Sequence, residues 1–159
     1  MKKKLLNLLQ KNPRMSDQTL AKILGVSTKK ITEIIKQLLD SEEIVGFVTV
    51  MNSNQKSDEV HAIVEVRINI TRGRGFNETA ERIARFPEVE NIYLISGNHD
   101  LNVFVRGKSL QEVSKFVHQK LATLENIRST NTHFLLKKYK EDGLIFDKKI
   151  NSKRLKVSA

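Results

Sequence analysis

The chain contains no cysteine, which excludes disulfides, thiolate zinc sites and cysteine nucleophiles. It also lacks any apolar run near the ~20 residues that a membrane-spanning helix needs. The basic start at positions 2–4 is followed by a segment that polar residues interrupt, and no small-residue cleavage site follows. We therefore expect no targeting segment, no membrane association and a cytoplasmic location. With 39% hydrophobic and 29% charged residues, the 159-residue chain is typical of one mid-sized or two small globular domains.

Sequence signatures of catalysis and metal binding are missing as well. The loop 73–75 (Gly-Arg-Gly) matches neither GxxxxGK[ST] nor GxGxxG, so we interpret it as a turn. No nucleophile stands out beside a base, and the histidines show no paired ligand spacing. We therefore expect no catalytic residue, no cofactor and no metal site. The histidines considered are His61, His99, His118 and His133.

Positive charge is in excess and is concentrated at the two ends of the sequence. The net charge is +10, and residues 1–50 carry nine basic and five acidic groups. Residues 143–159 carry five basic groups and one acidic group, whereas the middle of the chain is nearly balanced. A basic surface attracts phosphate polyanions, which makes nucleic acid the natural partner. The helices predicted in the same region make double-stranded DNA the expected one. A merely solubilising surface is the alternative that charge alone leaves open.

Three short helices are predicted in the first forty residues. Leucines mark one face of residues 2–11, and Pro13 stops that helix. Ser16 caps a second helix that ends at Gly25, and Ser27 caps a third. In the third helix, isoleucines and a leucine recur at the spacing of one buried face. Residues 44–50 then predict two short strands around Gly46, a β-wing. The buried face of the third helix consists of Ile31, Ile34, Ile35 and Leu38.

The second half predicts the element order β-α-β-β-α-β, the ferredoxin-like arrangement. Apolar residues alternate along the strand 60–70, and a helix from Phe76 ends before Pro87. Ser109 caps a second helix that carries an apolar stripe. The fold class is therefore α+β, with an antiparallel sheet and both helices on one face. The remaining strands are expected at 89–96, 101–106 and 128–139, and the stripe comprises Leu110, Val113, Val117, Leu121 and Leu124.

These patterns divide the chain into a winged helix-turn-helix domain at 1–51 and a βαββαβ domain at 59–142. A polar linker at 52–58 and a basic tail at 143–159 complete it. In a helix-turn-helix, the second helix enters the major groove of DNA and offers donors and acceptors to the base edges. The residues expected to contact DNA are Ser27, Thr28, Lys29, Lys30, Thr32, Glu33, Lys36 and Gln37.

Three strings together resemble the Lrp/AsnC family of leucine-responsive, or feast/famine, regulators. LAKILGVSTKKITEIIKQLLDSEEIVGFV is similar to the family's DNA-binding domain, GNHDLNVFVRG to its Gly-x-x-Asp turn between strands, and NIRSTNTHFLLKKYK to its last strand. The resemblance covers roughly residues 4–140. It departs from the family in starting at the first helix and in its longer basic tail. The resemblance implies a transcription regulator that forms homodimers through the C-terminal sheet, and often octamers.

The family resemblance also implies a site for a small effector, an amino acid or a related metabolite, between dimers. Backbone N–H groups at a glycine turn can bind a carboxylate, and an aspartate can bind an ammonium. A simple β-turn is the alternative interpretation of this segment. The sequence Asn98-His99 differs from what the family often has there, so the effector is not identified. The residues implied are Gly97, Asn98, His99, Asp100, Thr130 and Thr132.

Other functions remain open at this point. A DNA-organising protein would bind many sites and respond to no amino acid. A metabolic enzyme is possible because βαββαβ domains serve many functions, but it would need a titratable cluster in a pocket. RNA binding through the sheet would call for aromatic residues on its open face. Only Tyr93 and Phe104 are candidates there.

Overall fold

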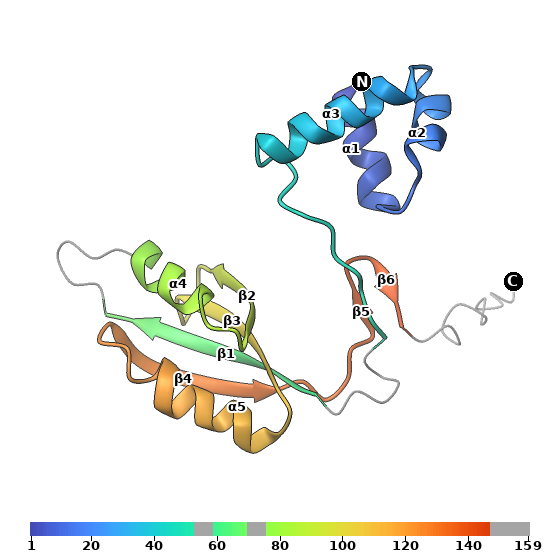
Figure 1. Cartoon of the computed structure of the whole chain (residues 1–159). Helices are drawn as coiled ribbons and strands as arrows, with labels where there is room; N and C mark the ends of the chain where they lie inside the picture. Colours follow the sequence, from blue (N-terminus) through green and yellow to red (C-terminus); the bar gives the residue numbers. More distant parts are fainter. Residues whose placement is uncertain (53–58, 70–75, 147–159) are drawn as a thin grey trace, which may run out of the picture. The chain divides into compact units, whose positions relative to one another are not determined.

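The structure is a computed structural model that describes residues 1–52, 59–69 and 76–146 (Figure 1). The chain divides into two compact units, Met1–Val50 and Met51–Ala159. Apart from Asn52, the predicted linker 52–58 lies outside the described residues, as do Ile70, the loop 71–75 and the tail beyond Phe146. Among the described residues, no helix is long and apolar enough to cross a membrane.

The first unit consists of the three predicted helices, α1 (Lys2–Lys11), α2 (Asp17–Leu24) and α3 (Thr28–Asp40). The two predicted serine caps are confirmed. The hydroxyl of Ser16 accepts from the N–H of Thr19, and the hydroxyl of Ser27 accepts from the N–H of Lys30. The three helices enclose one small core, whose buried residues are Leu5, Leu9, Leu20, Ala21, Ile31 and Leu38.

The predicted wing strands are not formed. Residues 45–52 carry no strand assignment, and Val45 and Val48 are 93% and 85% exposed. A two-stranded ribbon needs an apolar face that packs against something. Most of this segment is exposed, so the β-propensity of its valines does not suffice to make a hairpin.

The second unit contains the predicted four-stranded antiparallel sheet. Its strands are β1 (Val60–Ile68), β2 (Val89–Leu94), β3 (Leu101–Gly107) and β4 (Ile127–Phe134), and their order across the sheet is β2-β3-β1-β4. The central strand β1 pairs with β3 on one side and with β4 on the other. The predicted βαββαβ order is confirmed.

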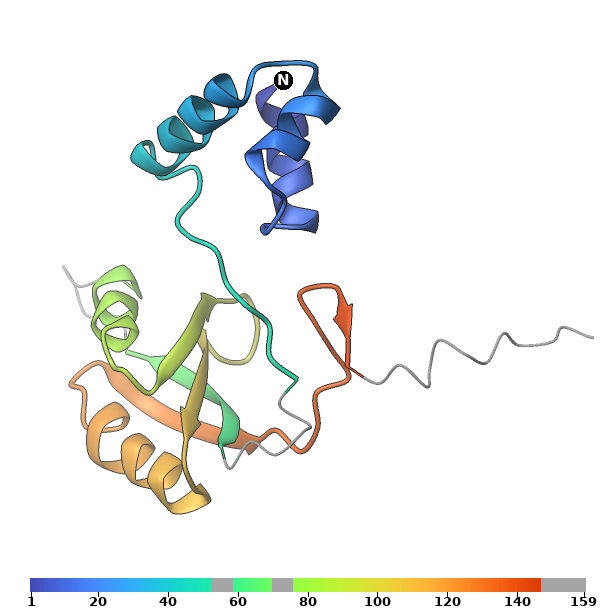
Figure 2. The same ribbon diagram turned by 45° about the vertical axis from the view of Figure 1, so that its right-hand side comes forward.

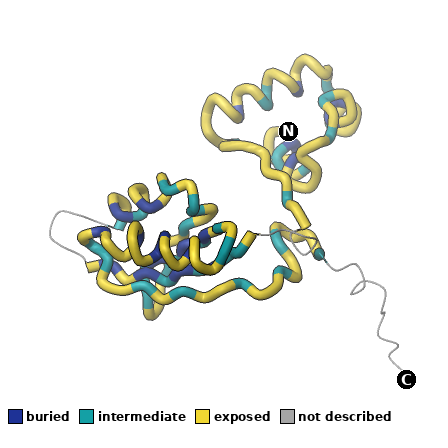
Figure 3. The backbone as a smooth tube through the Cα atoms, turned by 60° about the horizontal axis from the view of Figure 1, so that its bottom comes forward, coloured by how far each residue is buried: buried dark blue, intermediate teal, exposed yellow. Residues whose placement is uncertain are grey.

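Both helices of the second unit cover the same face of the sheet (Figure 2). They are α4 (Phe76–Ala84) and α5 (Leu110–Phe116), and α5 continues into a π-helical turn, Val117–Leu121. Alternate residues of β1 and β3 point into this core, so the period-two prediction for β1 is correct. Figure 3 shows the buried stretches along these inner strands and on the helix sides that face them. The core residues from the strands include Ala62, Val64, Val66, Leu101, Val103 and Val105, and those from the helices include Ile83, Val113 and Phe116.

Some details of the second unit differ from the sequence prediction. The last strand ends at Phe134 rather than at residue 139, and Leu110 is 51% exposed rather than part of the core. After Phe134, the N–H of Leu135 makes one more bond to the carbonyl of His61, the second residue of β1. The chain then forms an unpredicted hairpin of β5 (Lys140–Glu141) and β6 (Leu144–Ile145).

Candidate nucleic-acid interface and effector site

The turn between α2 and α3 is built by local rules. Gly25 ends α2 with φ 66°, a left-handed conformation that suits glycine. Its N–H donates to the carbonyl of Ala21. Two residues later, Ser27 begins α3 and satisfies the free N–H of Lys30 at 3.3 Å. The two helices are therefore joined by the short turn 25–27, which fits a helix-turn-helix.

The face of α3 opposite the core is polar, basic and exposed. Behind this polar face, Ile31 and Leu38 are fully buried, and Ile34 and Ile35 are half-buried. Three lysines on the helix give this surface a positive charge. All eight residues predicted to contact DNA are exposed, namely Ser27, Thr28, Lys29, Lys30, Thr32, Glu33, Lys36 and Gln37. The surface formed by these eight side chains is called the reading face below.

One residue of the reading face is tied to a neighbouring helix. The hydroxyl of Thr32 donates to Oδ2 of Asp17, in the first turn of α2, over 2.6 Å. The same hydroxyl lies 3.2 Å from the carbonyl oxygen of Thr28. Sequence analysis did not find this pair, because only the crossing of α2 and α3 brings the two residues together.

The predicted effector turn, residues 97–100, joins β2 to β3 at the end of the sheet. The carboxylate of Asp100 accepts the N–H of Ile68 at 2.7 Å, and the N–H of Asp100 donates to the carbonyl of Val66 at 2.9 Å. Asp100 therefore already holds the end of β1, and one of its two carboxylate oxygens is occupied. Gly97 and Asn98 are exposed.

The other predicted effector residues lie on two opposite faces of the sheet. Thr130 pairs with Val66 and Thr132 with Val64, so both threonines are on the helix-covered face. His99 is instead on the open face, where its Nε2 donates to Oδ1 of Asn102 at 2.8 Å. The described chain does not bring these residues together into one pocket.

A polar cluster that sequence analysis missed occupies the open face around Glu65. Asn131 donates to Oε2 of Glu65 at 3.3 Å, and His133 lies 3.3 Å from Oε1. His99 is 3.8 Å away. The hydrogen bond from Asn131, with the further contact from His133, holds the pKa of the Glu65 carboxyl below its ordinary value. The polar positions of the predicted strands were visible in the sequence, but their convergence depends on the register between β1 and β4.

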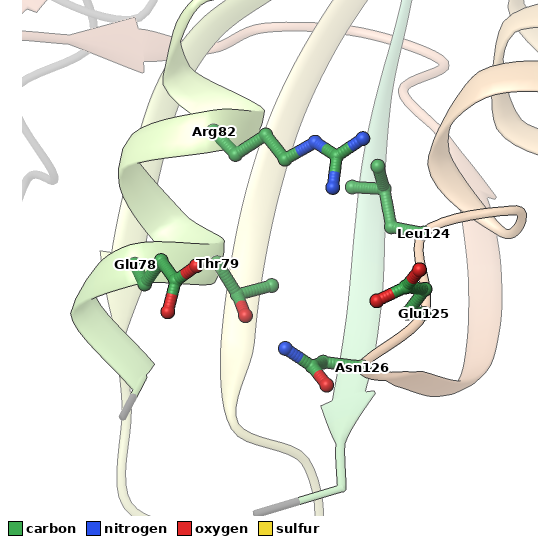
Figure 4. A pocket seen from close by; sticks show the side chains of 6 residues that line it. All are labelled: Glu78, Thr79, Arg82, Leu124, Glu125 and Asn126. Atoms are coloured by element: carbon green, nitrogen blue, oxygen red, sulfur yellow. The ribbon is translucent and has the colours of Figure 1, made fainter. Parts of the chain in front are cut away.

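A small pocket lies between α4 and residues 124–126 (Figure 4). The N–H of Asn69 donates to the carbonyl of Asn126 at 2.8 Å, which places this pocket beside the same end of β1 that Asp100 holds. Its volume of about 20 Å³ admits about one water molecule. An amino acid does not fit there within a single chain. The lining residues are Glu78, Thr79, Arg82, Leu124, Glu125 and Asn126.

A larger cleft of about 450 Å³ lies at the other end of the sheet, between Phe104 and the segment 135–141. Its size falls within the range of small-molecule sites. On one wall, Nδ1 of His61 lies 3.1 Å from Oε2 of Glu90. On the other, Nζ of Lys137 lies 4.8 Å from the ring centre of Tyr139. Sequence analysis had interpreted 135–139 as strand and did not predict this cleft.

Comparison with known proteins decides the family. The family model described as the Lrp/AsnC ligand binding domain matches residues 61–145, and a winged helix-turn-helix DNA-binding model matches residues 1–42. The chain belongs to the Lrp/AsnC family. It is a transcriptional regulator with a helix-turn-helix and an Lrp/AsnC effector-binding domain.

Individual members of the Lrp/AsnC family resemble the chain over nearly its whole length. The HTH-type regulator YugG of Bacillus subtilis, itself uncharacterized, is 40% identical over 97% of this chain and 94% of its own. The structure of Escherichia coli AsnC has a TM-score of 0.65 at 21% identity, covering 86% of this chain and 91% of its own. The NMB0573/L-Met complex from Neisseria meningitidis has a TM-score of 0.69 at 21% identity, covering 88% and 90%.

Proposed function

We propose that this Lrp/AsnC protein is a dimer that recognises a specific DNA sequence with residues 1–51 and binds an amino acid or related metabolite with residues 59–142. The observation that carries this proposal is the reading face of α3. It is exposed and basic, and the buried side chains of Ile31 and Leu38 hold it from behind. Lys29, Lys30 and Lys36 would supply contacts to phosphates. The exposed polar groups between them would contact base edges.

The dimer would form through the open face of the sheet. In the described part of the second unit, α4 and α5 cover one face only, and the opposite face carries aromatic side chains. Tyr93 is 54% exposed and packs edge-on against Phe104, with ring centres 5.7 Å apart. Two reading faces related by a twofold axis would bind half-sites about one helical turn apart, so the operator should be roughly palindromic. Assembly of dimers into an octamer is part of the same proposal.

The effector would bind near residues 97–100, Thr130 and Thr132, in a site that a second copy of the chain completes. Support comes from the size of the pocket at this end of the sheet, which holds about one water molecule in a single chain. The NMB0573 structure, a complex with L-Met, supports an amino acid as the class of effector. Binding would shift the equilibrium between two states of the assembly by the difference in affinity for them.

The reading face is tested by lysine substitutions and a duplex that the wild-type protein selects from a random DNA pool. Lys29→Ala and Lys36→Ala should each weaken binding to this duplex at least roughly tenfold, because each loses a charge-assisted contact. The slope of log affinity against log salt should also fall by about one for each substitution. Lys115→Ala, which removes the same charge from an exposed position on α5, serves as the control. If the two reading-face variants bind like the control, the proposed face is wrong.

A DNA-organising role without an effector is the second candidate, since the net charge of +10 favours contacts to phosphate at any sequence. Enrichment of no sequence motif from the random pool, together with no thermal shift with any of the twenty amino acids, would favour it over the proposed function.

A further inference from the structure

The pair of Asp17 and Thr32 lies at the edge of the reading face. Thr32 is exposed and Asp17 is half-buried. Their side chains are joined by the 2.6 Å bond described above, a distance typical of a hydroxyl that donates to a charged carboxylate. The Asp17–Thr32 bridge, as this bond is called below, links the first turn of α2 to the second turn of α3.

The bridge is not the main contact between α2 and α3. Leu20 and Ala21 of α2 already pack with Ile31 and Leu38 of α3 in the buried core. A hydrogen bond that is open to water adds little to such packing. The consequence of the bridge is therefore chemical, and it concerns what Thr32 can offer to DNA.

A threonine hydroxyl has one hydrogen to donate and two lone pairs that accept. In this structure the hydrogen of Thr32 is directed to Asp17, and the carbonyl of Thr28 lies nearby at 3.2 Å. What remains for a base edge is a pair of acceptor sites and the methyl group. The bridge thereby converts a side chain with two possible roles into one that only accepts.

We propose that Asp17 is a specificity-determining residue that makes Thr32 an acceptor-only reader of the major groove. This inference rests on the proposed function, since it requires α3 to lie in that groove. Guanine presents two acceptors there, whereas adenine and cytosine present amino donors and thymine a methyl group. The base facing Thr32 should therefore be adenine, cytosine or thymine, and guanine should be excluded.

The experiment is selection of binding sites from a random duplex pool by the full chain, with four variants beside the wild type. In Asp17→Ala the hydroxyl of Thr32 keeps only the 3.2 Å contact with the carbonyl of Thr28. The hydroxyl can then turn its hydrogen to a base, so guanine should become accepted at one position in each half-site, with a gain of roughly fivefold in relative affinity there. Asp17→Asn removes the same charge but keeps an acceptor, so its base preference should match the wild type. Because both variants relieve repulsion from phosphate equally, their difference isolates the bridge.

Two further variants make the test specific to the hydroxyl. Thr32→Val removes it, and in that background Asp17→Ala should change no base preference. Thermal unfolding of each variant should stay close to the wild type, which shows that the helices still pack. The inference is overturned if Asp17→Ala selects the wild-type motif, or if its effect persists in the Thr32→Val background; the proposed function then still stands. Failure of the wild type to enrich any motif would overturn both.

Discussion

Substitution of Ile31 tests whether the reading face depends on the small core behind it. Ile31 is fully buried in a cluster of only six buried residues. Replacing a packed isoleucine by alanine costs about 2–5 kcal/mol. At about 0.05–0.15 kcal/mol per residue, a unit the size of Met1–Val50 has only about 2.5–7.5 kcal/mol of stability. Ile31→Ala should therefore remove most of the stability of the first unit.

The stability of the second unit should be unaffected by Ile31→Ala, because its core shares no residue with the core of the first unit. In amide NMR spectra at increasing urea, the native signals of residues 1–50 should disappear at a much lower urea concentration in Ile31→Ala than in the wild type. The signals of the second unit should disappear at the same urea concentration in both. Affinity for the selected duplex should fall in parallel. Ile23→Ala is the matched control, since Ile23 is 55% exposed. Equal urea midpoints for the two variants would refute the reasoning that buried Ile31 supports the reading face.

The remaining predictions concern the second unit. Because hydrogen bonding lowers the pKa of Glu65 from its ordinary 4.5, its contribution to stability should be present above that pH and be lost as the pH falls through the folded-state value. Acid unfolding of Glu65→Gln should lack this component, and an unchanged acid profile would contradict it. If the effector binds near the threonines, Thr132→Val should abolish the thermal shift that an amino acid produces, whereas Tyr139→Ala in the larger cleft should leave it intact. Loss of the thermal shift in Tyr139→Ala but not in Thr132→Val would instead indicate that the effector binds in the larger cleft.

The sequence predicts the fold well where local chemistry and packing agree. The alternation along β1 identifies its buried face because one side of the sheet is covered by helices. The serine caps at Ser16, Ser27 and Ser109 are all observed, since an N-cap depends only on the next few residues. The helix-turn-helix could therefore be derived from residues alone.

Errors arise where a strand needs a partner that the sequence does not name. Residues 44–50 have β-branched residues, but within the unit only Ile44 packs against the core and most of the segment after it is exposed. The last strand stops at Phe134 because its partner there is Ala62, and β1 begins only two residues before Ala62. The hairpin that follows had a visible signal, since Asp142 and Gly143 have φ of 46° and 82°, as an Asp-Gly hairpin turn requires.

The candidate sites were only partly predictable for the same reason. Every residue predicted for the reading face is exposed, because helical periodicity decides which side of α3 faces outward. The cluster around Glu65 and the Asp17–Thr32 bridge join residues 68 or 15 positions apart. Such contacts depend on strand register and helix crossing, which one sequence without its structure does not give.

The proposed effector site, which a second copy of the chain would complete beside the one-water pocket, has a consequence for signalling. A metabolite that needs two copies of the chain to surround it is thermodynamically linked to their association, so each strengthens the other. The apparent sensitivity to the metabolite would then rise with the amount of regulator in the cell. Such a switch would respond to its own abundance as well as to nutrient supply.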